Sequence, residues 1–237
     1  MDKSKVIFGN EIAEKDYRKS CKKKKKYLKK FGDDSSAVYR FAATENPVLA
    51  GIGVKDLVLS EEGGFEPDDK ALIVGNIRMG YGHYRISMAI ASAAHALGYK
   101  PYWLDLNSYS ASTATKIISY QNDLYSTGSR LSQKFSLFNK LVWEPMNYEG
   151  FRKLTYNSAD QKVSELMVPL INGLPKDIPY IATHAWPAQA AVHAGFKRVI
   201  NCIPDNWPMA LHLSEGSIHT VQTPNAFTRA FFHQSIP

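Results

Sequence analysis

Residues 71–106, ALIVGNIRMGYGHYRISMAIASAAHALGYKPYWLDL, contain the alternation of strand and helix that decides the fold. The opening apolar run predicts a strand, residues 75–82 a glycine-bearing loop, and the Ala- and Ile-rich residues 83–97 a helix. A second apolar run at residues 101–106 predicts another strand. This order is typical of a βαβ unit, in which ligands bind where the loop after the first strand meets the helix N-terminus.

The same rhythm returns near the C-terminus. Short strands are predicted at residues 178–183, 197–203 and 217–223, and helices at residues 187–194 and 225–233. Strands that alternate with helices predict an α/β fold with a Rossmann-like, mainly parallel sheet and helices on both faces.

The segments around the βαβ unit are less regular. Residues 33–46 contain a polar turn, and the β-branched residues in 48–59 predict a strand or hairpin that adds an edge to the sheet. Residues 115–172 have mostly helical spacing, broken at Pro145 and Gly150. Their apolar stripes favour core packing, but the aromatic and basic residues of 135–143 also suit a lipid or partner surface.

The positive charge is concentrated in one segment. The chain has 237 residues and a net charge of +7, and the segment from Lys15 to Lys30 holds ten Lys or Arg residues and one acidic residue. That segment carries +9, which leaves −2 for the rest of the chain. The basic character therefore does not indicate a nucleic-acid-binding domain.

Residues 1–46 are interpreted as a basic helical N-terminal arm, and residues 47–237 as the Rossmann-like domain. A solvated helix or tail is one interpretation of the arm. The alternative is contact with an anionic membrane surface through Lys15 to Lys30.

Composition excludes several protein classes. Cys21 and Cys202 are far apart and do not suggest a disulfide framework. No stretch approaches the roughly 18 apolar residues of a spanning helix, and the N-terminus lacks a signal-peptide pattern. We expect a cytoplasmic protein, with peripheral attachment to a membrane as an option.

The loop at Met79, Gly80, Tyr81, Gly82 and His83 is the first candidate site. Glycine permits positive φ and close approach of a ligand to the backbone. The spacing matches neither the dinucleotide fingerprint nor the P-loop.

His83 falls in the first turn of the predicted helix. The helix dipole lowers the pKa of an imidazole there, which favours a neutral ring able to act as a base. A helix-capping histidine without chemistry is the alternative.

Other ionisable residues follow predicted strands. Asp105, His184 and Asp205 each lie at or just after a strand end, so a parallel sheet places them on the same rim as His83. Each can also be a structural polar group. We find neither the spacing of metal ligands nor the G-x-S-x-G elbow of hydrolases, so no metal and no cofactor are predicted.

The motif Gly80, Gly82 and His83, followed by Arg85 and Ser87, resembles the N-terminal domain of GT-B glycosyltransferases. Tyr84 is an apparent insertion in that pattern. The nearest group comprises the monogalactosyldiacylglycerol synthases, diacylglycerol glucosyltransferases and MurG. A second part of the resemblance covers residues 183–230, where these residues match: His184, Pro204, Asp205 and Pro224.

The resemblance implies the acceptor-binding half of an enzyme that moves a sugar from a nucleotide sugar to a lipid-linked or glycan acceptor. His83 would be the general base, and Asp205 and His184 would orient the acceptor. The implied catalytic residues are His83 and Asp205, and the implied acceptor-binding residues are Met79, Gly80, Tyr81, Gly82, Arg85, His184 and Asp105.

In that family a second Rossmann domain binds most of the nucleotide sugar, and residues 1–237 stop where it would begin. We therefore expect a missing C-terminal domain or partner subunit and little activity from this chain alone. A sugar-nucleotide epimerase of GT-B shape and a non-catalytic Rossmann-like binding module are the alternatives.

Overall fold

The computed structural model describes residues 2–62 and 64–228. In these residues a seven-stranded sheet has the order β3-β4-β6-β5-β7-β8-β9, and only β3 and β4 pair antiparallel. The predicted α/β fold with a mainly parallel, Rossmann-like sheet is confirmed. The strands are β3 (Phe41–Glu45), β4 (Lys55–Leu59), β5 (Ala71–Asn76), β6 (Lys100–Asp105), β7 (Tyr180–Ala182), β8 (Val199–Cys202) and β9 (Ile218–Thr220), and a separate hairpin comprises β1 (Val6–Ile7) and β2 (Asn10–Glu11).

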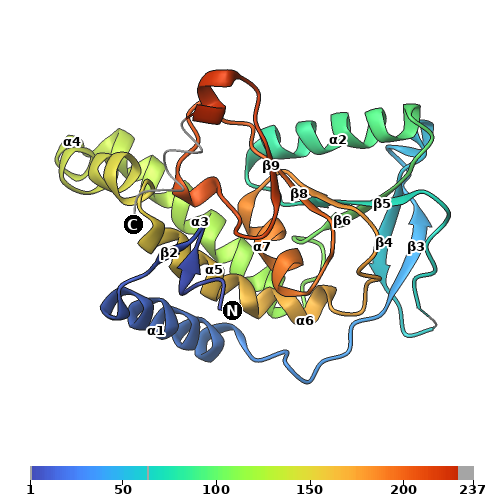
Figure 1. Cartoon of the computed structure of the whole chain (residues 1–237), viewed down its shortest axis with the longest axis horizontal. Coiled ribbons are helices and arrows are strands. Elements are labelled where there is room, and N and C mark those ends of the chain that lie inside the picture. Colours follow the sequence, from blue (N-terminus) through green and yellow to red (C-terminus); the bar gives the residue numbers. More distant parts are fainter. Residues whose placement is uncertain (1, 63, 229–237) are drawn as a thin grey trace.

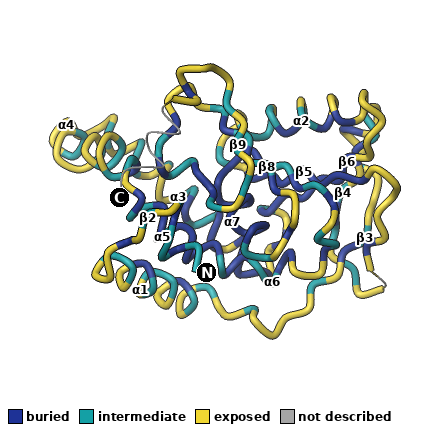
Figure 2. The backbone as a smooth tube through the Cα atoms, viewed as in Figure 1, coloured by how far each residue is buried: buried dark blue, intermediate teal, exposed yellow. Residues whose placement is uncertain are grey.

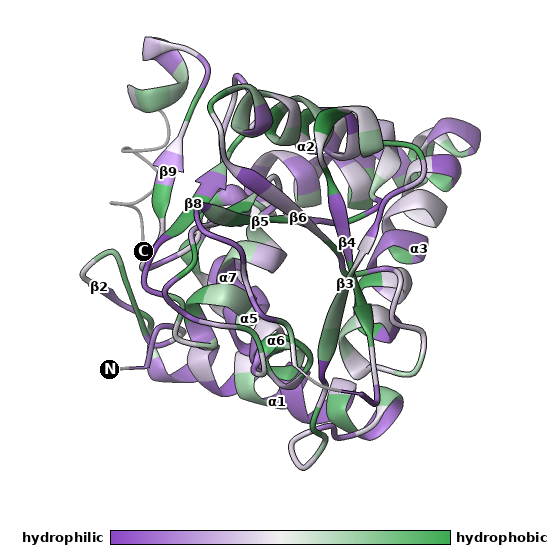
Figure 3. Cartoon of the chain, turned by 90° about the vertical axis from the view of Figure 1, so that its right-hand side faces the viewer, coloured by the Kyte–Doolittle hydropathy of each residue, from purple (hydrophilic) through white to green (hydrophobic). Residues whose placement is uncertain are grey.

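Helices cover both faces of the sheet, with α2 on one face and α3, α5, α6 and α7 on the other (Figure 1; Figure 3 shows the same layers from the side). The longer helices are α1 (Glu14–Phe31), α2 (Gly80–Ala96), α3 (Thr113–Lys134), α5 (Leu154–Ser164) and α7 (Ala185–His193). The short helical segments are η1 (Ala50–Ile52), α4 (Ser136–Phe138), η2 (Asn139–Trp143), η3 (Met146–Gly150), η4 (Glu165–Met167), α6 (Val168–Ile171) and η5 (Ala210–His212).

The βαβ unit has the predicted order, β5-α2-β6. The helix begins three residues earlier than predicted, at Gly80, which has φ of +71°. Glycine adopts this left-handed conformation without strain, so the chain can turn directly from the loop into the helix. His83 consequently lies in the first turn, as expected.

Two apolar layers hold the sheet between its helices, and Figure 2 shows the central strands and α7 as buried. All six residues of β5 are buried. The layer under α2 contains Leu72, Val74, Ala91, Ala94 and Trp103. The larger layer on the opposite face joins the sheet to α1, α3, α5, α6 and α7.

The prediction of only a polar turn in residues 33–46 was wrong, because β3 lies in that segment and pairs with β4. Its residues after Phe41 are partly or fully exposed, so β3 lacks the apolar alternation that marks a strand in sequence. Phe41 itself is buried and packs edge-to-face against Tyr109. The predicted edge strand in residues 48–59 is β4, which extends the sheet beside β6.

The basic helix α1 packs along α5 and joins the main core. Ser20 and Tyr27 are buried, and the hydroxyl groups of Ser20 and Ser158 are 3.0 Å apart. Lys23 and Lys24 pair with Asp160 and Glu165 respectively. The division at residue 46 therefore separates elements that pack together and falls between the paired strands β3 and β4.

The outward face of α1 remains basic. Lys15, Arg18, Lys19, Lys22, Lys25, Lys26 and Lys29 are all exposed. Their spacing of three or four residues places them on one side of the helix. We call these seven residues the basic face.

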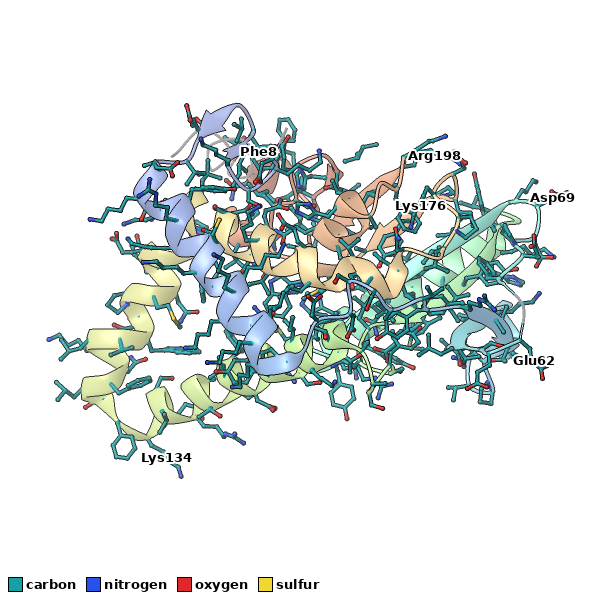
Figure 4. All side chains as sticks on the ribbon, turned by 90° about the horizontal axis from the view of Figure 1, so that it is seen from below. Phe8, Glu62, Asp69, Lys134, Lys176 and Arg198 are labelled. Carbon is teal, nitrogen blue, oxygen red and sulfur yellow. The ribbon has the colours of Figure 1, made fainter. Side chains whose placement is uncertain are left out.

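The end of α3, together with α4 and η2, forms a projecting apolar hairpin. Phe135, Leu137 and Leu141 are exposed on it, and Lys134 lies at its outer end (Figure 4). Helical turns continue through Pro145, contrary to the predicted break. Pro145 lies between the wider π-helical turns η2 and η3, and helices take up an irregular residue at such turns. In residues 2–62 and 64–228, no helix has the length and apolar character needed to cross a membrane.

Candidate functional site

The candidate site lies where the strand order reverses direction. From β5 the chain passes through α2 to β6 on one side, and from β7 it passes through α7 to β8 on the other. Ligands of open α/β sheets bind at this crevice, at the carboxyl ends of the strands. Here α2 contributes His83, and the residues that follow β7 are Thr183 and His184.

His83 is held in one orientation by the backbone. Its Nδ1 lies 2.7 Å from the carbonyl oxygen of Thr183. A carbonyl only accepts, so Nδ1 carries the proton and the Nε2 lone pair is left for a ligand. Burial lowers the pKa of His83, against opposing effects of the Thr183 carbonyl and of Asp205. The predicted direction of the shift is confirmed, but burial is its largest cause.

His184 is held in the opposite tautomer. It is the N-cap of α7, and its Nδ1 accepts a hydrogen bond of 3.2 Å from the backbone N–H of Trp186. The proton of the neutral ring is therefore on Nε2. Burial, together with neighbouring His83 and His212, holds the pKa of His184 well below its usual value. The rings of His83 and His184 meet edge-to-face with centroids 5.1 Å apart.

A third histidine, His212, contacts Asp205 at the site. Nδ1 of His212 accepts a 2.9 Å hydrogen bond from the N–H of Met209, and its Nε2 lies 3.4 Å from Oδ2 of Asp205. The Nε2–H of His212 is directed to Asp205, so the site combines one imidazole acceptor, at His83, with one donor nitrogen, at His184. This arrangement suits a hydroxyl group, which both donates and accepts.

These groups line one cavity of about 830 Å³, which we call the histidine cavity. Its walls are rich in aromatic side chains from α3, η2, α5, α7, the turn before α5 and the loop after β8. They include Tyr125, Trp143, Phe151, Tyr156, Trp186 and Trp207. Such a cavity fits a ligand with a large apolar or sugar-ring surface.

A buried network of polar side chains connects α2 to the neighbouring strands. The hydroxyl of Ser87 donates to Oδ1 of Asn76 at 3.2 Å and lies 3.1 Å from the hydroxyl of Thr183. Ser87, Asn76 and Thr183 are all fully buried. The network ties α2 to β5 and β7, and so fixes His83 against its carbonyl partner.

Asp105 does not join the three histidines. Both of its carboxylate oxygens are already engaged, one by the N–H of Asn107 and the other by Arg78 and Ser108. It lines a separate cleft of about 750 Å³ on the β6 side of α2, together with Gly80 and Tyr81. Asp105 shares the rim of the sheet, but the N-terminus of α2 separates it from the histidine cavity.

The remaining predicted residues are divided between these places. Met79 lines the histidine cavity with His83, His184 and Asp205. Gly82 and Arg85 are exposed and line neither cavity. In the described ranges, no three His, Cys, Asp or Glu side chains are grouped as metal ligands would be.

Sequence reasoning missed His212, Lys23 and Asp160, which also line the histidine cavity. His212 is seven residues after Asp205, in a segment without regular periodicity. Lys23 lies within a run of lysines and does not stand out in the sequence. Its spacing of three and four residues from Ser20 and Tyr27 could have predicted that it lies on the inner face of α1.

Comparison with known proteins gives one result, a match to a family model. No curated protein and no solved structure gives a match. One family model matches residues 6–231, nearly the whole chain. By this match the chain belongs to the family described as Domain of unknown function (DUF6937).

Proposed function

We propose that this chain is the acceptor-binding half of a glycosyltransferase that moves a sugar from a nucleotide sugar to a hydroxyl group of a lipid-linked acceptor. The observation that carries the proposal is the 2.7 Å hydrogen bond from His83 Nδ1 to the Thr183 carbonyl, because it presents Nε2 as a base. The lowered pKa of His83 keeps that base unprotonated near pH 7.

The proposed step begins with the acceptor hydroxyl donating to Nε2 of His83 and accepting from Nε2–H of His184. His83 takes the proton while the hydroxyl oxygen bonds to the anomeric carbon of the sugar. The bond from that carbon to the nucleotide phosphate breaks in the same event. Asp205 favours the charged His83 that results, since its carboxylate raises the pKa of that ring.

The donor is proposed to be a nucleotide sugar held by a further domain or a partner subunit, with no metal and no nucleic acid involved. The aromatic walls of the histidine cavity favour an acceptor with an apolar part. Arg85, outside both cavities, and Asp105, in the separate cleft, are not assigned to the acceptor.

The test is sugar transfer. Release of nucleoside diphosphate from UDP- and GDP-sugars is measured with a lipid extract, in a lysate of the native cell that supplies any donor-binding partner. We expect added wild-type chain to raise the rate of transfer. Loss of a general base lowers the rate roughly 100-fold or more, so added His83→Gln chain should give no such increase. His95→Gln, at the far end of α2, is the matched control. Equal transfer with the wild-type chain and His83→Gln would contradict the proposal.

We also propose that the basic face and the apolar hairpin hold the protein at the cytoplasmic surface of an anionic membrane. Each Lys or Arg near such a surface contributes about 1 kcal/mol. Deleting residues 1–32 would not be a clean test, since α1 packs into the core. Instead, Lys22, Lys25, Lys26 and Lys29 are changed to Gln, and flotation is measured with vesicles of phosphatidylcholine and phosphatidylserine. Unchanged flotation would remove the basic face from the proposal.

A further inference from the structure

The histidine cavity has a second polar region, where α1 meets α3 and α5. Lys23 and Tyr27 reach it from α1, Gln121 from α3, and Asp160 from α5. Tyr27 and Tyr120 pack edge-to-face with centroids 5.9 Å apart, which joins α1 to the turn that carries Gln121. We call this region the α1 end of the cavity.

The charges at the α1 end cancel. Nζ of Lys23 donates to Oδ1 of Asp160 at 3.1 Å, and Nε1 of Trp186 donates to Oδ2 at 3.1 Å. Asp160 is 1% exposed, so its carboxylate is satisfied by protein groups and screened little by water. Trp186 also packs against His184, with ring centroids 4.6 Å apart, and therefore links the α1 end to the histidines.

Gln121 supplies a group that the protein does not satisfy. Its side chain lines the cavity and is 8% exposed, and within the described residues its Oε1 has no hydrogen-bond partner. Buried amide oxygens are nearly always paired, so an unpaired one on a cavity wall indicates a missing donor. Oε1 is itself buried in this conformation, so rotation of the side chain, which can also exchange the places of Oε1 and Nε2, presents it to a ligand.

We propose that the α1 end is a binding subsite for an uncharged hydrogen-bonding group, such as the hydroxyls of a sugar or of glycerol. Gln121 accepts from that group, and Lys23 donates to it with a proton not used by Asp160. An anionic group would face the buried Asp160 carboxylate and gain little from a lysine that is already neutralised. The ligand of the cavity is then neutral and mostly apolar, with one polar group at the histidines and another at the α1 end. This inference rests on the proposed function only in taking the cavity as the acceptor site.

The experiment compares two probes with the same chain and different heads. Octyl β-glucoside is neutral and octyl sulfate is anionic, and each is titrated below its micelle concentration. Tryptophan fluorescence reports binding, because Trp143, Trp186 and Trp207 line the cavity. We expect saturable quenching by octyl glucoside at lower concentration than by octyl sulfate.

Three variants test the assignment. Gln121→Leu is expected to weaken octyl glucoside binding roughly three- to tenfold, the effect of one lost hydrogen bond, without loss of folding. Gln133→Leu, on the exposed part of α3, is the matched control and should bind like the wild type. Asp160→Asn leaves Lys23 without its counter-charge and should reverse the preference toward octyl sulfate.

Several results would overturn the subsite: no saturable quenching by octyl glucoside, tighter wild-type binding of octyl sulfate, or equal octyl glucoside affinity in Gln121→Leu and wild type. An Asp160→Asn protein that folds and keeps the neutral preference would also overturn it. The transfer assay with His83→Gln is independent of these results. A failure there removes the proposed function and leaves the subsite standing.

Discussion

Gly75 and Tyr180, on the neighbouring strands β5 and β7, give the sharpest prediction of stability. A Cβ added at Gly75 would lie 2.5 Å from Cζ and 2.6 Å from Cε1 of Tyr180 and would also meet its hydroxyl. Tyr180 is fully buried, and its ring packs against Phe196 with centroids 5.2 Å apart. Neither strand has room to move, since both lie in the middle of the sheet.

Gly75→Ala should therefore destabilise the protein by about 3 kcal/mol, at the upper end of the range for overpacked cores. A urea titration followed by circular dichroism should show a midpoint lower by roughly 1 M. Gly82→Ala is the matched control, because it lies in α2 with nothing within 4 Å of an added Cβ. That change should leave the free energy of unfolding unchanged or raise it by up to about 1 kcal/mol.

Tyr180→Leu removes the ring atoms that an alanine at Gly75 would strike. The double variant should therefore be more stable than the sum of the two single changes implies, by roughly 2 kcal/mol. Additive effects, or a Gly75→Ala protein as stable as Gly82→Ala, would refute the packing argument. Tyr180→Phe should cost little, because the hydroxyl has no partner among the described residues.

Three further perturbations test the electrostatics and the cavity wall. Burial lowers the pKa of His193 and of His219 to about 4. Between pH 6.5 and 4 the unfolded chain therefore binds more protons than the folded chain, and each residue removes about 1.4 kcal/mol of stability per pH unit as the pH falls. Urea titrations across that window should show a shallower dependence in the variant with both histidines changed to Gln, and an unchanged slope would contradict this. Gly128→Ala should displace the Trp143 ring, because the added Cβ would overlap Cζ3 and lie 2.9 Å from Cε3, and an emission spectrum identical to the wild type would argue against that contact. Asp160→Asn should lower the free energy of unfolding by roughly 2 kcal/mol, since it leaves a half-buried ammonium group unpaired, and unchanged thermal unfolding would count against it.

The fold was largely predictable because its elements have local signatures. The apolar runs of β5 and β6 and the small residues of α2 lie within one continuous stretch, as do β7, α7 and β8. Hydrophobic periodicity reports such elements directly. The edge strand β3 escaped prediction because four of its five residues are partly or fully exposed, so its pairing with β4 holds it in the sheet more than its own pattern does.

The candidate site was predictable only in part. The sequence placed His83 at a helix start and His184 after a strand, which suggested a shared rim. It did not distinguish Asp105, which α2 separates from them, from Asp205, which lies in the same cavity. That difference depends on which side of β5 each strand takes in the sheet, and no local pattern records the strand order.

By itself, the sequence determined the order of strands and helices, the α/β class and the position of His83 in the first turn of α2. The tertiary structure alone decided the tautomer of His83, because its carbonyl partner Thr183 is 100 residues away in the chain. It also decided that Lys23 faces inward to Asp160 while Lys22, Lys25 and Lys26 face solvent. Local residue patterns set which elements form, but the chemistry of this site depends on contacts between elements that meet only when the sheet has assembled.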